Sequence, residues 1–195
     1  MRTLHIATHG FFDAEEAQNS MYGAGLLMAG VSDWLHGKEL APYGNGVATA
    51  DEISRMDLGG TELVVLSSCL SGMNDRTLSR GFHGLVSAMS AAGAHYVITQ
   101  LWAADDFGTA IFMDAFYRFC SDQMPPPMAL NMAKRYLREL TAGELRRDGW
   151  VDRAAAVQDT SRREEFLKQL AGLDDCSTPF QNEAYWGGFS CYQCY

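Results

Sequence analysis

The stretch LVVLSSCLSG, residues 63–72, decides the fold class. An apolar run of leucine and valine ends abruptly in Ser-Ser-Cys, and a glycine follows. A short apolar run without polar alternation is typical of a strand that is buried on both faces of a parallel sheet. Similar runs occur in LHIAT (4–8) and HYVITQLW (95–102). The sequence therefore predicts an α/β protein with a mostly parallel sheet.

Helical patterns separate and follow these strands. Leu85 and Met89 have helical spacing in the segment before Gly93, so the pattern indicates a strand–helix–strand crossover. Two helices are predicted at 106–122 and 125–140, the second restarting after three prolines. A short helix is expected at 51–58 with Asp51 as its N-cap. Further strands are expected at 25–30 and near the end of the chain, in AYWGGFSCYQCY.

Length and composition limit the number of domains, the location and the class of partner that we expect. With 195 residues, of which 47% are hydrophobic, the chain is expected to form a single domain over 1–195. No apolar run reaches the roughly 20 residues of a membrane span, and the first residues lack the pattern of a secretory signal. We therefore expect a cytoplasmic protein with no membrane partner. The net charge of −9 argues against direct nucleic-acid binding, because a phosphate backbone would be repelled.

The five cysteines predict neither a disulfide framework nor a metal centre. Their number is odd and their spacing uneven. Cys191 and Cys194 form a Cys-x-x-Cys pair, and Cys176 lies nearby, but a structural zinc site needs four ligands. The sequence assigns no role to these three thiols. We expect no metal and no organic cofactor.

His9 and Cys69 are the candidate reactive residues. Each follows a predicted strand and is soon followed by a glycine, in LHIATHG and LVVLSSCLSG. The carboxyl ends of parallel strands share one edge of a sheet, so the two side chains can meet although 60 positions separate them. An imidazole beside a thiol favours the nucleophilic thiolate. The alternative is that Cys69 packs in the core, where free cysteines are common, and that His9 caps a strand.

A resemblance to a known family favours the reactive interpretation. The order and spacing of LHIATHG, GLLMAG, TADEISRMDLGGTELVVLSSCLSG, GFHGLVSAMSAAGAHYVITQLWAADD, AIFMDAFYRF and MALNMAKRYLREL resemble the CHAT family of caspase-like proteins. The pattern PF-x-x-x-x-YW-x-x-F at 179–189 is similar to that family's last strand. The resemblance implies a caspase-like three-layer α/β/α sandwich. It also implies kinship with caspases and separases, which are cysteine endopeptidases, and frequent attachment to tetratricopeptide (TPR) repeats.

The family resemblance implies specific roles for three residues. His9 is expected to be the general acid and base, and Cys69 the nucleophile. The N–H groups of Gly10 and Cys69 are expected to form the oxyanion hole. Such a dyad acts without a cofactor.

Two features depart from the family pattern. Family members commonly carry Ala-Cys-Glu-Thr-Gly at the nucleophile, whereas this chain has Ser68-Cys69-Leu70-Ser71-Gly72. Leu70 is therefore expected to alter the wall of the substrate pocket. The chain also starts close to the His9 strand, so we expect the fold to lack its N-terminal strands. This chain would then be the catalytic portion of a larger domain, completed by a TPR or other regulatory domain or chain.

Asp105, Asp106 and Trp102 are candidate substrate-binding residues. They lie in LWAADD (101–106), directly after a predicted strand, and related proteases place specificity residues near the equivalent loop. Either aspartate could pair with a basic P1 residue, or could instead be the N-cap of the next helix. Trp102 could line the pocket or fill the core.

The expected function is that of a cysteine endopeptidase cleaving a specific protein partner. The alternative is a catalytically silent caspase-like module that serves interaction in a regulatory assembly. The sequence does not name the substrate, its P1 preference or the activating signal.

Overall fold

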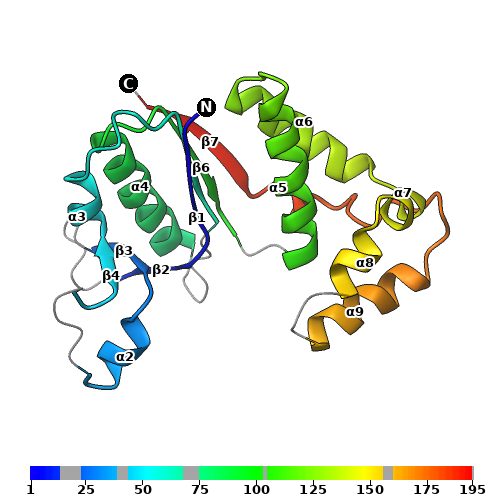
Figure 1. Ribbon diagram of the computed structural model, residues 1–195, viewed down its shortest axis with the longest axis horizontal. Helices are drawn as coiled ribbons and strands as arrows, with labels where there is room; N and C mark the ends of the chain where they lie inside the picture. The colour runs from blue at the N-terminus through cyan, green and yellow to red at the C-terminus, as the bar shows by residue number, and fades with distance from the viewer. Residues whose placement is uncertain (14–22, 39–43, 68–74, 103–104, 156–159, 195) are drawn as a thin grey trace. The chain divides into compact units, whose positions relative to one another are not determined.

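The computed structural model describes residues 1–13, 23–38, 44–67, 75–102, 105–155 and 160–194. The chain forms two compact units (Figure 1). Unit 1 comprises residues 1–103 and 189–195, and unit 2 comprises residues 104–188. The expectation of a single domain over 1–195 stays a prediction.

The mostly parallel sheet expected from the sequence is present in unit 1. Its strands are β1 (Thr3–Ile6), β5 (Leu63–Leu66), β6 (Tyr96–Gln100) and β7 (Phe189–Gln193), in the order β1-β5-β6-β7. β1, β5 and β6 run parallel, and β7 pairs antiparallel to β6. All four residues of β5 are buried, which is why that strand reads as a continuous apolar run. The fold is therefore mixed α/β with a mostly parallel sheet flanked by helices, consistent with a caspase-like fold.

Unit 1 has a second sheet, which changes the expected boundary of the first strand. β2 (His9–Phe12), β3 (Ala24–Leu27) and β4 (Val47–Thr49) form an antiparallel sheet in the order β2-β3-β4. The stretch LHIATHG is thus not one strand that ends at His9. β1 ends at Ile6, and His9 opens β2 in the other sheet. The helix α2 (Val31–Leu35) follows β3.

The helix α4 (Asp75–Ala91) packs against the parallel sheet, and α3 (Ala50–Ser54) packs against α4 (Figure 1). Leu85, Ala88 and Met89 of α4 share one buried core with Val64, Leu66 and Val97 of the sheet. Gly93 follows α4 with a φ of +103°, which is the helix stop predicted from the sequence.

The predicted N-cap at Asp51 is wrong, because the N-cap lies two positions earlier. Thr49 is the N-cap of α3, and its hydroxyl accepts a hydrogen bond from the N–H of Glu52. The Glu52 carboxylate accepts in turn from the N–H of Thr49 at 2.9 Å, which completes a capping box. Asp51 lies in the first turn and pairs with Arg55 at 2.7 Å.

Unit 2 is helical. The two long helices predicted from the sequence are present as α5 (Asp106–Ser121) and α6 (Pro126–Glu139), which pack against each other. Three shorter helices follow: α7 (Ala142–Arg147), α8 (Trp150–Ala155) and α9 (Thr160–Ala171). A 3₁₀ turn, η1 (Glu183–Tyr185), precedes the return of the chain to β7. Among the described residues, none of the helices combines the length and the apolar character needed to cross a bilayer.

Candidate active site

The site predicted from the sequence begins where β1 and β5 end. The N–H of Ser67, directly after β5, donates to the carbonyl of Ile6 at 2.9 Å. This bond extends the parallel ladder by one residue beyond the two strands. His9 stands three positions after Ile6, and Cys69 stands two positions after Ser67. The two predicted reactive residues therefore follow the ends of two strands that are hydrogen-bonded to each other.

A side-chain contact reinforces this edge of the sheet. The Nε2 atom of His5 lies 3.1 Å from the hydroxyl oxygen of Ser67. Partial burial lowers the pKa of His5 below its ordinary value of 6.5. The neutral imidazole is thus favoured at this position. The sequence assigned no functional role to His5, because its contact with Ser67 depends on the register of β1 against β5.

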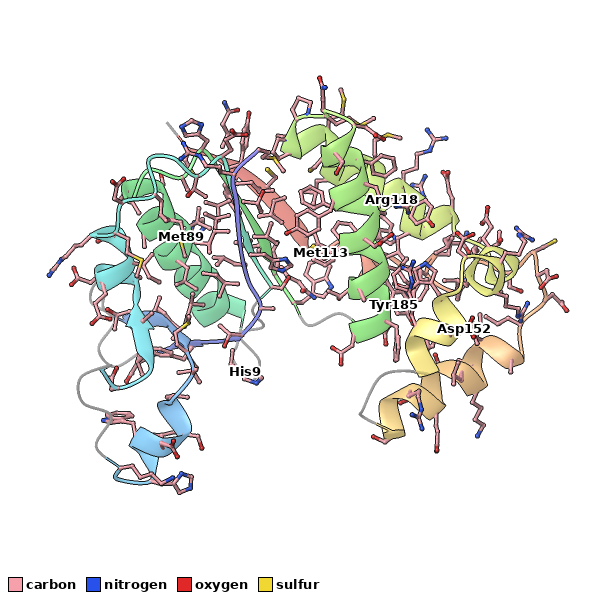
Figure 2. All side chains as sticks on the ribbon, in the orientation of Figure 1. His9, Met89, Met113, Arg118, Asp152 and Tyr185 are labelled. Atoms are coloured by element: carbon pink, nitrogen blue, oxygen red, sulfur yellow. The ribbon has the colours of Figure 1, made fainter. Side chains whose placement is uncertain are left out.

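His9 is exposed at the start of β2. Its neighbour Thr8 donates a hydroxyl hydrogen bond to the carbonyl of Leu27, and His9 itself pairs with Leu27 in the ladder of β2 and β3. Figure 2 shows the imidazole projecting outward from the turn between β1 and β2. Gly10 is half-buried and pairs with Leu26. The second sheet thus fixes the backbone on either side of His9 and leaves the ring accessible.

Two of the predicted site residues lie outside the described residues. These are Cys69 and Leu70, within the segment 68–74. The pairing of His9 with Cys69 and the oxyanion hole formed by Gly10 and Cys69 stay predictions. The described structure brings together Ile6 and Ser67, from which the two segments continue.

Trp102 and the two aspartates occupy different settings. Trp102 is 41% exposed, so it does not fill the core. Asp105 is the N-cap of α5, and its Oδ1 atom accepts a hydrogen bond from the N–H of Gly108 at 2.7 Å. Asp106 is the exposed first residue of the same helix. The N-cap alternative thus holds for Asp105, and Asp106 presents its carboxylate in the first turn.

The cysteines other than Cys69 show no sign of a metal site in the described part of the chain, and one of them is a poor nucleophile. Among the described residues, Cys120, Cys176, Cys191 and Cys194 form no disulfide. Burial raises the pKa of Cys120 to about 11, so this thiol stays protonated at neutral pH. Across the described ranges, no group of three or more His, Cys, Asp or Glu side chains is placed to hold a metal ion.

Comparison with known proteins agrees with the fold and with the motifs. The sequence matches the CHAT domain over residues 1–193, which is nearly its full length. No curated protein matches the sequence. The match covers both units, the His9 strand, the Cys69 segment and the final strand. The chain therefore belongs to the CHAT domain family, whose members are caspase-like.

Proposed function

We propose that this protein is a cysteine endopeptidase that uses a dyad of Cys69 and His9. The observation that carries the proposal is the hydrogen bond from the Ser67 N–H to the Ile6 carbonyl. This bond joins the ends of the two strands that precede His9 and Cys69. One residue of extended chain spans at most about 3.6 Å, and only two or three positions separate this bond from each of the two residues, which supports their pairing. Membership of a caspase-like family supports the same chemistry.

The proposed reaction is acyl transfer through a thioester. The Cys69 thiolate attacks the carbonyl carbon of the scissile peptide bond, and the electron pair of the carbonyl moves to its oxygen. The N–H groups of Gly10 and Cys69 would stabilise that oxyanion. When the C–N bond breaks, the imidazolium of His9 gives its proton to the leaving amine. Water, deprotonated by His9, then attacks the thioester and releases the acid and the Cys69 thiolate.

We assign a basic P1 preference to Asp106. Asp106 is exposed in the first turn of α5, directly after the N-cap Asp105. A guanidinium or ammonium group at P1 is the natural partner of a carboxylate. Leu70 and Trp102 are proposed to supply apolar contacts to the substrate. The substrate is a protein, and the need for a reduced thiol suits a cytoplasmic location.

A peptide-library cleavage profile tests the activity and the preference together. Wild type is expected to cleave after basic residues, and Cys69→Ala is expected to be inactive. Asp106→Asn should lose the basic preference while retaining Cys69 reactivity. Asp105→Asn is the matched control, since asparagine caps a helix as well as aspartate does. Cleavage by Cys69→Ala at the wild-type rate would exclude the dyad, and unchanged basic cleavage by Asp106→Asn would exclude the P1 assignment.

The open edge of the parallel sheet supports a second candidate function, in regulation by a partner. Within the described part of the chain, β1 pairs only with β5, so its outer edge is unpaired. Exposed strand edges accept added strands from other segments. We propose that a TPR-containing or other regulatory chain completes the sheet there. A catalytically silent module would keep this interaction as its only role. It would bind its partner, yet neither wild type nor Cys69→Ala would cleave it.

A further inference from the structure

Unit 2 contains a cavity that the proposed endopeptidase activity does not use. Its volume is about 310 Å³, which is at the lower end of the range for small-ligand sites. Phe166 and Leu170 of α9 line one part of it, with Leu173 just beyond that helix. Phe180 and Tyr185 line another part. These five residues fall within 166–185, and Asp105, at the start of α5, lines the cavity from a distant part of the sequence.

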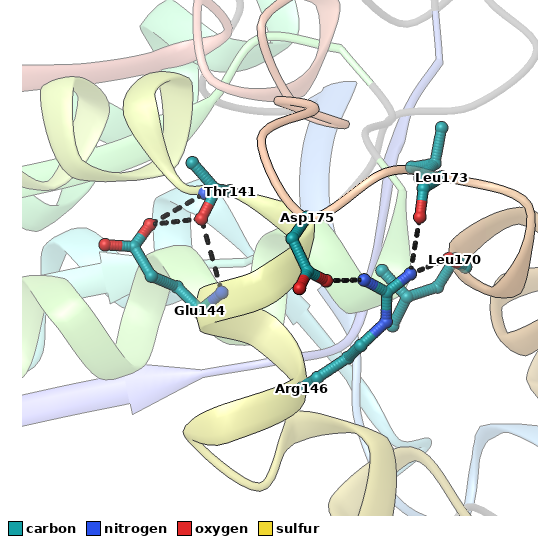
Figure 3. A network of polar contacts seen from close by, with 6 residues as sticks. All are labelled: Thr141, Glu144, Arg146, Leu170, Leu173 and Asp175. Carbon is teal, nitrogen blue, oxygen red and sulfur yellow. Dashed lines mark hydrogen bonds and ion pairs between the residues drawn. The ribbon is translucent and has the colours of Figure 1, made fainter.

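The cavity walls are held in place by contacts outside the cavity itself. Arg146 of α7 donates two hydrogen bonds of 2.7 Å from Nη2, to the carbonyls of Leu170 and Leu173, and pairs through Nη1 with Asp175 (Figure 3). The guanidinium thus fixes the C-terminal end of α9, where two lining leucines are located. A preformed wall of this kind reduces the entropy lost when a ligand binds.

The aromatic walls are also packed. The Phe166 ring stacks on Phe107 with centroids 4.3 Å apart, and Phe180 meets Tyr185 edge-on at 5.1 Å. Tyr185 is labelled in Figure 2, beside the helices of unit 2. Ring faces favour both apolar groups and organic cations, whereas ring edges favour apolar groups.

One carboxylate faces this apolar surface. Asp105 lines the cavity, and none of the lining residues is basic. The Oδ1 atom of Asp105 accepts the cap hydrogen bond from Gly108. For the described residues, the structure records no hydrogen bond or ion pair at Oδ2. A side chain at Gly108 would approach Phe180 to 3.3 Å, so the glycine permits the ring to lie close to the carboxylate.

We propose that this cavity binds an organic cation with an apolar stem, of the primary alkylammonium class. The stem would contact the leucine and phenylalanine side chains, and the ammonium would pair with the Asp105 carboxylate. An alcohol of the same shape would fill the cavity without the charge interaction. The cation could be a free amine or the side chain of a lysine in a peptide, and the two sources share this chemistry. The inference does not rest on the proposed dyad, because no residue of the cavity belongs to it.

Binding can be followed at the cavity itself by NMR of leucine methyl groups. The probes are hexylammonium, the neutral 1-hexanol and a lysine blocked at both backbone ends, each titrated into the Cys69→Ala protein. Use of this variant separates the result from any cleavage activity. Saturable shifts of the Leu170 and Leu173 methyl signals report occupation. Asp105→Asn removes the charge but retains the cap, and Asp106→Asn removes a charge at the adjacent position, which does not line the cavity.

Hexylammonium is expected to bind about tenfold more tightly than 1-hexanol, and Asp105→Asn should abolish that difference, as expected for a hydrogen bond to a charged group. Asp106→Asn should leave it unchanged. Shifts with blocked lysine would support a peptide source, and shifts with hexylammonium alone a free amine. Equal binding of the alcohol, no shift with either cation, or an equal loss in Asp106→Asn would overturn the proposal.

Discussion

The Nε2 atom of His5 lies 3.1 Å from the hydroxyl oxygen of Ser67, at the edge where β1 and β5 end. Ser67 is two positions before Cys69, so this contact lies directly before the segment that carries the candidate nucleophile. Because the pair is partly accessible to water, we expect a coupling free energy of about 0.5 to 1 kcal/mol. Urea unfolding of wild type, His5→Ala, Ser67→Ala and the double variant measures it. Strictly additive losses would show that the two side chains do not interact.

The pH dependence of stability provides a separate test of His5. Its pKa in the folded protein is lowered by burial, whereas the unfolded chain has the ordinary value of 6.5. Between these two values the unfolded state binds a proton that the folded state does not, so stability falls as the pH drops below 6.5. His5→Gln should reduce the loss in unfolding free energy between about pH 7.5 and about pH 5.5. An identical loss in the variant would contradict the lowered pKa.

The Arg146 contacts should stabilise unit 2. Arg146→Met removes the ion pair with Asp175 and leaves the carbonyls of Leu170 and Leu173 without their donor. We expect a loss of about 2 kcal/mol in unfolding free energy, the range for hydrogen bonds to a charged group. Arg146→Lys should recover only part of it, because an ammonium lacks the planar fork. Arg147→Met, an exposed neighbour on α7, is the control and should cost less than about 0.5 kcal/mol. Equal losses at the two positions would argue against the clamp.

Gly93 should tolerate no side chain. Its φ of +103° is unfavourable for other residues, and an added Cβ would lie 2.9 Å from the Cα and N atoms of Gly59. Backbone atoms cannot move aside cheaply, so Gly93→Ala should cost about 2 kcal/mol or more. Gly172→Ala is the matched control, since the nearest atom to its added Cβ is 3.8 Å away. Thermal unfolding of both variants distinguishes them, and a Gly93→Ala protein as stable as wild type would show that the turn can rearrange.

The sequence was sufficient to predict the parallel strands and the long helices, for reasons visible in particular residues. Leu63–Leu66 is fully buried and therefore purely apolar, and α5 and α6 are long enough to show helical spacing. A strand was expected at 25–30, where β3 lies, but the second sheet was missed because β2 and β4 have only four and three residues, too few to display a period. The N-cap at Thr49 was missed although Glu52 three positions later is the signature of a capping box.

The candidate site was predictable only in part. Strand ends followed by glycine indicated His9 and Cys69, since residue type and strand position are both local. The contact between His5 and Ser67 depends on the register of β1 against β5, which local patterns do not specify. The cavity beside Asp105 depends on how α7, α9 and residues 179–185 pack, and Arg146 reaches Asp175 across 29 positions. Such long-range packing leaves no periodic signal in the sequence.

Site-resolved alkylation by iodoacetamide at about pH 7 tests the proposed dyad most directly, because only the thiolate reacts. Mass spectrometry reports each cysteine separately in one sample. The exposed Cys176 is the reference thiol, and Cys120, with its pKa raised to about 11, marks an unreactive one. We predict that Cys69 reacts faster than Cys176 in wild type and that this advantage disappears in His9→Ala. The advantage should persist in His83→Ala, which changes an exposed histidine of α4. A Cys69 rate that His9→Ala leaves unchanged would contradict the dyad.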